Sequence, residues 1–321
     1  MRWLLTALLA VSGQVSSQDN AHRWLNEMSS ALQSLNYDGT FVYLHDGKLE
    51  TMRIVHQTGE HGEMERLVSL TGSPREVLRD DRIVTCIMAD SKSVTVGQRR
   101  PRQPFPVVPE DLDSLSRYYQ LQELGEDRMA GYVSRIISIT PRDRFRYGYR
   151  FWIDTGNYML LKSDLIDADG EAIEQVMFTH LSVTNSIPVT ALQPSLTGDG
   201  YSWTRQGVDS HHPAARPGSP DWVVKRLPVG FELTDFQRKP MRKDGASVEH
   251  MVFSDGLATM SVYVEKLGPD DKVFQGLSNM GAMNAYGAVV DDHQVTVIGE
   301  VPPATVQMVA SSVGAHESGH D

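Results

Sequence analysis

The chain has 321 residues, which is enough for about two domains, and its 40% hydrophobic and 22% charged residues are typical of a globular protein that buries a core. The formal net charge of −11 argues against general nucleic-acid binding, which needs clustered lysine and arginine against phosphates. The single cysteine, Cys86, excludes an intramolecular disulfide. We interpret it as a small buried hydrophobe.

The first 17 residues have the pattern of a cleavable secretory signal. Arg2 supplies a positive charge, residues 3–11 form an apolar run, and small residues continue to Ser17. The apolar run is shorter than the ~20 residues that a transmembrane helix needs. We therefore expect an exported protein, and a bacterial periplasm is the simplest compartment for a chain without disulfides.

The next part of the chain predicts a helix followed by many short strands. Apolar residues at three- and four-residue spacing indicate an amphipathic helix over residues 19–35. Turn dipeptides such as Asp46-Gly47 separate the β-forming runs that follow. A proline-rich stretch at 97–109 and a short helix at 110–119 interrupt the strands. Strands are expected near residues 40–44, 49–56, 64–70, 75–79, 82–88, 132–140, 147–153, 159–167 and 173–183.

Prolines without periodicity predict a linker at residues 187–220. The linker would separate an N-terminal domain at 18–186 from a C-terminal domain at 221–313, and residues 314–321 would be a disordered tail. The second domain reads as short strands with a closing helix at 304–313. Its strands are expected near 222–227, 231–236, 248–254, 258–265, 285–290 and 294–301. The fold class is α+β, mostly antiparallel β, because no βαβ alternation appears.

Catalytic and metal-binding patterns are absent from the sequence. It contains no G-x-S-x-G elbow, no phosphate-binding loop ending in Lys-Ser or Lys-Thr, no HExxH and no paired CxxC. Histidines such as His211 and His212 are best read as solvated side chains. We therefore expect a protein that is not an enzyme and uses neither a metal nor a cofactor.

Several strand-like runs are apolar at consecutive positions, which indicates a sheet covered on both faces. The cover could be a helix and loops, or it could enclose a cavity that takes acyl chains. Burial of each methylene would contribute ~0.8 kcal/mol, so such a cavity needs no specific motif. The candidate lipid-cavity residues are Trp24, Met28, Phe41, Tyr43, Phe151, Ile153, Val176 and Phe178.

A second candidate site is basic. Arg142, Arg144, Arg146 and Arg150 alternate with aromatic residues, and a strand would place the last three on one face. The pattern fits a solvated outer face, or a cationic patch that binds an acidic peptide or a lipid head group.

A set of segments, in a particular order, resembles a known family. They are Tyr37-Asp-Gly-Thr-Phe-Val-Tyr43, Thr140-Pro-Arg-Asp-Arg-Phe-Arg-Tyr-Gly-Tyr149, Leu160-Leu-Lys-Ser163, Leu227-Pro-Val-Gly-Phe231, Ser254-Asp-Gly-Leu-Ala258 and Val297-Ile-Gly-Glu-Val-Pro302. Their order and spacing resemble the MucB/RseB family, periplasmic regulators of the sigma-E envelope stress response.

The resemblance implies a fold and a function. The N-terminal domain should be an open half-barrel like LolA and LolB, with helices in its concavity. The C-terminal domain should be a sheet with a helix, and this domain should bind a partner. Family members bind the periplasmic domain of an RseA- or MucA-like anti-sigma factor and shield it from site-1 proteolysis. Lipid or lipopolysaccharide-like ligands favour release. The family carries no catalytic residues.

Two other functions stay open at this point. A lipid or lipoprotein carrier would use the same cavity without a regulatory partner, although simple carriers of this fold lack a second domain. An envelope hydrolase would need a catalytic serine or histidine that no motif indicates. A homodimer is compatible with the sequence, but no feature requires it.

Overall fold

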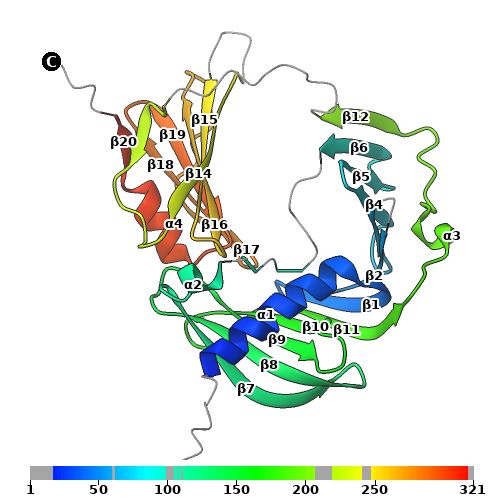
Figure 1. Ribbon diagram of the computed structural model, residues 1–321. Helices are drawn as coiled ribbons and strands as arrows, with labels where there is room; N and C mark the ends of the chain where they lie inside the picture. Colours follow the sequence, from blue (N-terminus) through cyan, green and yellow to red (C-terminus); the bar gives the residue numbers. More distant parts are fainter. Residues whose placement is uncertain are drawn as a thin grey trace, which may run out of the picture.

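The protein folds as two β-sheet domains with few helices (Figure 1). The computed structural model describes residues 17–59, 62–98, 105–106, 108–109, 111–206, 219–240 and 247–316. The signal-like segment therefore lies outside the described residues, except for Ser17. Of the helices within the described ranges, none has both the length and the hydropathy of a membrane span.

The N-terminal domain is one 12-stranded sheet. The strands are β1 (Asn36–His45), β2 (Lys48–Gly59), β3 (Gly62–Ser69), β4 (Arg75–Asp80), β5 (Ile83–Met88), β6 (Ser93–Gln98), β7 (Tyr119–Met129), β8 (Tyr132–Pro141), β9 (Gly148–Asp154), β10 (Leu160–Ile166), β11 (Ala172–Thr184) and β12 (Ser202–Gln206). Their order is β12-β6-β5-β4-β3-β2-β1-β11-β10-β9-β8-β7. The two end strands do not pair with each other in the described chain, so the sheet is open, as expected for a half-barrel.

Helix α1 (Ser17–Ser34) lies in the curve of this sheet (Figure 1). It packs against β7 and β8, and its apolar stripe is buried: Leu25 and Met28 are both 0% exposed. These side chains share one core with Phe41 of β1 and Phe178 of β11. The predicted amphipathic helix is therefore confirmed, and it covers the inner face of the sheet.

The C-terminal domain is a six-stranded antiparallel sheet with one helix packed on it. Its strands are β14 (Glu232–Pro240), β15 (Ser247–Ser254), β16 (Thr259–Lys266), β17 (Gly276–Met280), β18 (Met283–Val290) and β19 (His293–Gly299). Helix α4 (Pro303–Ala310) packs on β18 and β19, with Val306 and Val309 fully buried against Val297. Proline at the first helical position suits this start, because its missing N–H would have no partner there.

The structure adds elements that the sequence did not indicate. β6, β7 and β17 were not predicted, and the predicted linker is partly folded. Helix α3 (Val189–Leu192) and β12 lie within it, and β12 pairs in parallel with β6 at the edge of the N-terminal sheet. Residues of the predicted disordered tail are also folded, because β20 (Val313–Ala315) pairs with β13 (Trp222–Val224). Residues 317–321 lie outside the described residues.

Candidate functional site

An open cavity of about 640 Å³ lies on the inner face of the N-terminal sheet. We call it the trough. Its apolar side chains come from strands β1–β5 and β9–β11 of the N-terminal sheet, from β18 of the C-terminal domain, and from the segment before α2 (Leu112–Leu115). They include Phe41, Met52, Leu67, Val77, Phe105 and Val176. Because inner-face residues alternate along each strand, neighbouring strands together present a continuous apolar floor.

Charged side chains stand at the edges of the trough. Arg75 and Arg79 line it on β4, and both are paired: Arg75 with Glu50 at 2.5 Å, and Arg79 with the buried Glu65. Burial raises the pKa of Glu65, and the charge of Arg79 partly offsets that rise. These ion pairs leave the apolar floor between them free of unpaired charge.

The opposite wall of the trough comes from both domains. Glu174 of β11 accepts a 2.7 Å hydrogen bond from the Tyr43 hydroxyl and a 3.1 Å bond from the backbone N–H of Ala282 in the C-terminal domain. The Tyr149 hydroxyl donates to Glu300 of the C-terminal domain at 2.8 Å. Burial first, and then these carboxylates, raise the pKa of both tyrosines, so both hydroxyls remain hydrogen-bond donors. A ligand in the trough would therefore touch both domains.

The eight residues predicted to line a lipid cavity gather in one hydrophobic cluster. Phe41, Tyr43 and Val176 line the trough. The others lie in the packed core: Trp24, Met28, Phe151, Ile153 and Phe178 are at most 7% exposed. The runs of consecutive apolar residues did not distinguish filled core from open cavity, and lipid binding by these eight residues stays a prediction. Arg75, Glu174 and Glu300 were missed, because the residues near them come from distant strands.

The two domains meet at a buried ion pair, which we call the domain joint. Arg146 Nη1 lies 2.6 Å from a carboxylate oxygen of Asp255, and Arg146 Nη2 donates to the Val229 carbonyl at 2.7 Å. The guanidinium lies over the rings of Tyr118, Tyr119 and Phe231. The Tyr119 hydroxyl also donates to Asp255, at 2.9 Å. Each polar atom of this cluster thus has a partner from the other domain or from the same loop.

The basic residues predicted as one strand face are separated by the structure, so that expectation is wrong. Arg142, Arg144 and Arg146 lie in the loop between β8 and β9, and only Arg150 lies on a strand. Asp143 turns the chain there by accepting the Phe145 N–H at 2.9 Å. Arg142 and Arg144 are exposed, whereas Arg146 is fully buried in the domain joint. Binding of a partner or head group by these arginines stays a prediction for the two exposed ones.

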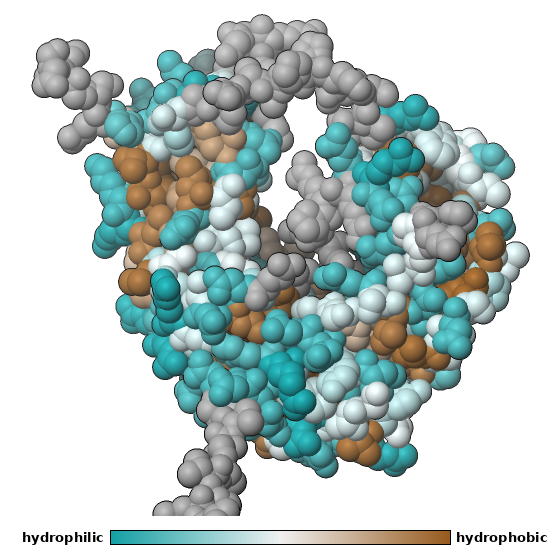
Figure 2. Space-filling view, in the orientation of Figure 1, coloured by the Kyte–Doolittle hydropathy of each residue, from teal (hydrophilic) through white to brown (hydrophobic). Residues whose placement is uncertain are grey.

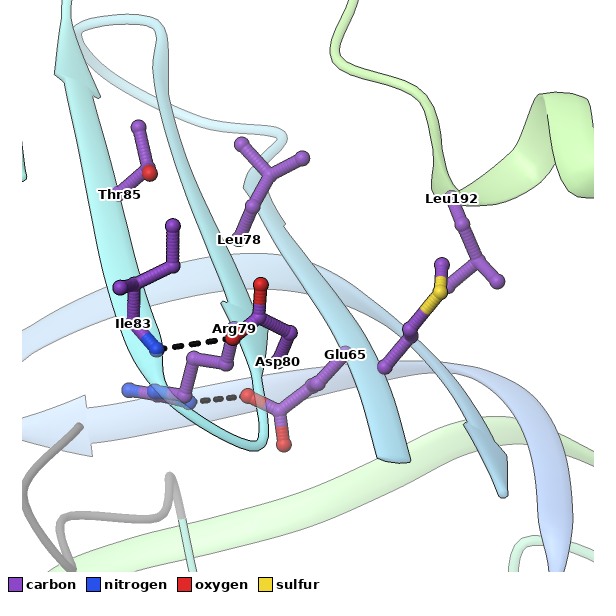
Figure 3. A pocket seen from close by; sticks show the side chains of 8 residues that line it. Glu65, Leu78, Arg79, Asp80, Ile83, Thr85 and Leu192 are labelled. Carbon is purple, nitrogen blue, oxygen red and sulfur yellow. Dashed lines mark hydrogen bonds and ion pairs between the residues drawn. The ribbon is translucent and has the colours of Figure 1, made fainter. Parts of the chain in front are cut away.

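The outer face of the sheet carries the segment at residues 187–201, which we call the strap. The buried carboxylate of Glu76 accepts bonds from Ser195 N and Leu196 N of the strap, and it pairs with Arg66 at 3.1 Å. A smaller cavity, of about 260 Å³, lies beside it. Figure 3 shows Leu192 of the strap on one side of this cavity and Leu78, Ile83 and Thr85 of the sheet on the other.

Within the described ranges, no group of three or more His, Cys, Asp or Glu side chains is arranged to hold a metal ion. Cys86 is half-buried on β5, and burial raises the pKa of its thiol, which disfavours the reactive thiolate. The polar clusters of the molecule instead join elements: Glu76 holds the strap, and Arg146 holds the second domain.

An open antiparallel sheet with an apolar trough, joined to a smaller sheet-and-helix domain, defines a two-domain protein with the cavity of a ligand-binding protein. Comparison with known families agrees with that class over most of the chain. A model of the MucB/RseB N-terminal domain matches residues 20–196, and a model of the MucB/RseB C-terminal domain matches residues 216–314. The chain belongs to the MucB/RseB family.

Named relatives match nearly the whole chain. "Sigma factor AlgU regulatory protein MucB" of Pseudomonas aeruginosa is 32% identical over 317 residues, covering 97% of this chain and 95% of the relative. "Sigma-E factor regulatory protein RseB" of Haemophilus influenzae is 28% identical over 318 residues, covering 96% of each chain. The RseB protein of Escherichia coli K12 is 26% identical over 319 residues, covering 97% of this chain and 95% of the relative.

Solved structures of MucB also match. MucB in complex with MucA(peri) superposes with a TM-score of 0.72 at 28% identity, covering 93% of this chain and 100% of that chain. The Pseudomonas aeruginosa MucA/MucB complex gives a TM-score of 0.73 at 29% identity, with the same coverage. MucB alone gives 0.61 at 29% identity, covering 92% of this chain and 98% of that chain.

Proposed function

We propose that this protein is a periplasmic negative regulator of a sigma-E-type envelope stress response. It binds the periplasmic domain of an RseA- or MucA-like anti-sigma factor and shields that domain from site-1 proteolysis. A lipid or lipopolysaccharide-like ligand in the N-terminal domain promotes release. The observation that carries the proposal is the superposition of both domains on MucB in complex with MucA(peri).

Two further observations support it. At nearly equal identity, the TM-scores for the two MucA complexes, 0.72 and 0.73, are higher than the 0.61 for MucB alone. The trough is bounded by residues of both domains, including Tyr43 and Glu300. A ligand there changes contacts between the domains and so changes the affinity for the partner. By linkage, the partner changes the affinity for the ligand by the same coupling free energy, commonly about 1–3 kcal/mol.

The test is calorimetric titration of the mature protein with the periplasmic domain of the host's RseA/MucA-like protein. The titration is repeated with saturating lipopolysaccharide or a single-chain amphiphile. Tight partner binding that lipid weakens about fivefold or more is the expected result, because a coupling of 1 kcal/mol corresponds to that factor.

The alternative function is a periplasmic carrier of lipid or lipoprotein. Its supporting observation is the trough itself, which would hold acyl cargo without any regulatory partner. Transfer of bound lipid to acceptor vesicles, together with no measurable binding of the anti-sigma domain, would replace the regulator by the carrier.

A further inference from the structure

The outer face of the N-terminal sheet carries polar side chains at one level of four adjacent strands. Strand pairing places Gln122 of β7 opposite Ser138 of β8, Ser138 opposite Arg150 of β9, and Arg150 opposite Asp164 of β10. We call these four residues the polar row. The residues that alternate with them on β8 and β9 belong to the core that α1 covers, so the polar row lies on the face opposite the trough.

Two groups in the centre of the polar row have no bonding partner. Three buried side-chain nitrogen or oxygen atoms lack a hydrogen bond among the described residues, and two of them are Ser138 Oγ and Arg150 Nε. Ser138 is only 5% exposed, and it stands directly opposite Arg150 in the β8–β9 pairing. Buried polar groups are nearly always hydrogen-bonded, so two such atoms on paired residues point to a bound ion or water.

The charged groups around Arg150 already have partners. Asp164 accepts hydrogen bonds from Lys162 at 2.9 Å and from Gln175 at 3.0 Å. The Lys162 ammonium also lies 4.0 Å from the centre of the Trp152 ring, and Trp152 Nε1 donates to Asp127 at 2.9 Å. Arg150 lies 6.0 Å from the same ring, and it forms no ion pair with any described residue. Arg150 is therefore the cation of this cluster that is left without a carboxylate.

The charges of the cluster determine which anion fits. Two cations, Arg150 and Lys162, lie near two carboxylates, those of Asp127 and Asp164, so the four charges sum to zero. A dianion such as phosphate would bring two negative charges close to both carboxylates, whereas a carboxylate ligand brings one. Repulsion thus favours a singly charged ligand.

The donors also suit a carboxylate. A guanidinium presents two parallel N–H groups, one of them on Nε, to the two oxygens of a carboxylate. The Ser138 hydroxyl can donate a third hydrogen bond to one of these oxygens. Arg150 is partly exposed, and rotation about its side-chain bonds moves the guanidinium outward and opens both unbonded atoms to a ligand.

We infer that Arg150 and Ser138 form a carboxylate-binding site on the outer face of the N-terminal sheet. The carboxylate is carried by an acidic peptide or by a small free acid. The site lies outside the trough and requires neither a lipid nor the anti-sigma factor. Its failure and the failure of the proposed function are therefore separate results.

The test follows the Nε–H resonance of Arg150 by nuclear magnetic resonance in the full mature chain, assigned by its loss in Arg150→Lys. Sodium acetate, sodium phosphate and sodium chloride are added at neutral pH and equal ionic strength. We expect acetate to shift this resonance about threefold or more further than phosphate or chloride. The peptide acetyl-Gly-Glu-Gly-amide, compared with its glutamine analogue, shows whether a peptide carboxylate also binds or only a free acid.

Two serines of β8 give a matched pair of variants. Ser138→Ala removes an unbonded hydroxyl, so it should leave the urea midpoint unchanged or higher and weaken acetate binding about threefold or more. Ser134 lies on the same strand and the same face, but its hydroxyl donates to the Asp127 carbonyl at 3.1 Å. Ser134→Ala should therefore lower the urea midpoint and leave acetate binding unchanged.

Three results would overturn the inference. If neither acetate nor the glutamate peptide shifts the Arg150 resonance more than chloride does, water bridges the two unbonded atoms. A larger response to phosphate would contradict the selection of a singly charged ligand. Equal loss of acetate binding in Ser138→Ala and Ser134→Ala would assign the effect to a general change in β8, because only Ser138 stands opposite Arg150.

Discussion

The guanidinium of Arg146 and the carboxylate of Asp255 form an ion pair of 2.6 Å with both side chains fully buried, although 109 positions separate them in the sequence. Arg146 belongs to the N-terminal domain and Asp255 to the β15–β16 turn of the C-terminal domain. Taking Arg146 away leaves the Asp255 carboxylate buried without its cationic partner, which is costly, whereas Arg146 also pairs with Asp143 at 3.1 Å. The two charges are buried while the domains are docked, and separation of the domains would expose both charges to water.

Substitution of Arg146 by alanine should weaken the domain joint strongly. The loss should be about 3–5 kcal/mol, the range typical of breaking a buried ion pair. We expect a lower urea midpoint and a larger radius of gyration by small-angle scattering. Arg144→Ala is the matched control, because Arg144 is exposed in the same loop. Equal behaviour of the two variants would show that the joint does not depend on this ion pair.

Gly230 should be more sensitive to alanine than a glycine of similar conformation. Its φ is +94°, and a Cβ there would overlap the ring of Tyr118, which packs on Arg146. Gly256 has φ +99°, but a Cβ there would meet only Pro109 at ordinary contact distance. Both variants carry the backbone strain of a positive φ, and only Gly230→Ala adds the overlap. The urea midpoint of Gly230→Ala should be the lower one, and similar midpoints would contradict this explanation.

The hold of Glu76 on the strap should depend on pH. Burial alone would raise the pKa of Glu76, but hydrogen bonds from Arg66 and Ser195 bring it below its ordinary value of 4.5. The folded protein thus binds this proton less readily than the unfolded chain. Its contribution to the free energy of unfolding is complete above pH 4.5 and is lost as the pH falls through the lower, folded pKa.

Glu76→Gln should therefore destabilise the protein at pH 7 and make less difference as the pH falls below 4.5. Hydrogen exchange of the β12 amides gives the local measurement, because the strap leads into that strand. Faster exchange in β12 at pH 7, with β10 unchanged, is the expected pattern. A difference between variant and natural protein that grew in acid would have the wrong sign for this linkage.

Met28 and Val176 should separate the core from the trough. Met28 is 0% exposed on the buried face of α1, and its replacement by alanine should cost about 2–5 kcal/mol in the free energy of unfolding. Val176 is only partly buried and lines the trough, so Val176→Ala should cost less than half as much. Urea unfolding of both variants gives the comparison, and the reverse order would place Val176 in the packed core.

Much of the fold follows from local sequence pattern. Runs such as Phe41–Leu44 alternate or cluster apolar residues between clear turns, and the predicted strands there match β1. β7 was missed because Tyr119–Met129 is polar along most of its length, as suits an edge strand with one exposed face. β12 was missed because its only support is a parallel partner, β6, about 110 residues earlier in the chain.

The site was less predictable than the fold. Four nearby arginines indicate an exposed basic surface, and that interpretation fits Arg142 and Arg144. Arg146 departs from it because Asp255 and Val229, far along the chain, supply its partners. No spacing in the sequence distinguishes a buried arginine from a solvated one.

The C-terminal domain follows one end strand of the 12-stranded sheet in the chain, but it docks against the opposite end of that sheet. The chain leaves through β12, whereas the domain joint uses the end that contains β7, β8 and β9 (Figure 1). The space-filling view is hollowed between the C-terminal domain and the β4–β6 region (Figure 2). Docking is thus an intramolecular association, and such associations commonly have effective concentrations of about a millimolar. A joint too weak to hold separate domains can still stay closed here, and cleavage between β12 and β13 would make its closure depend on protein concentration.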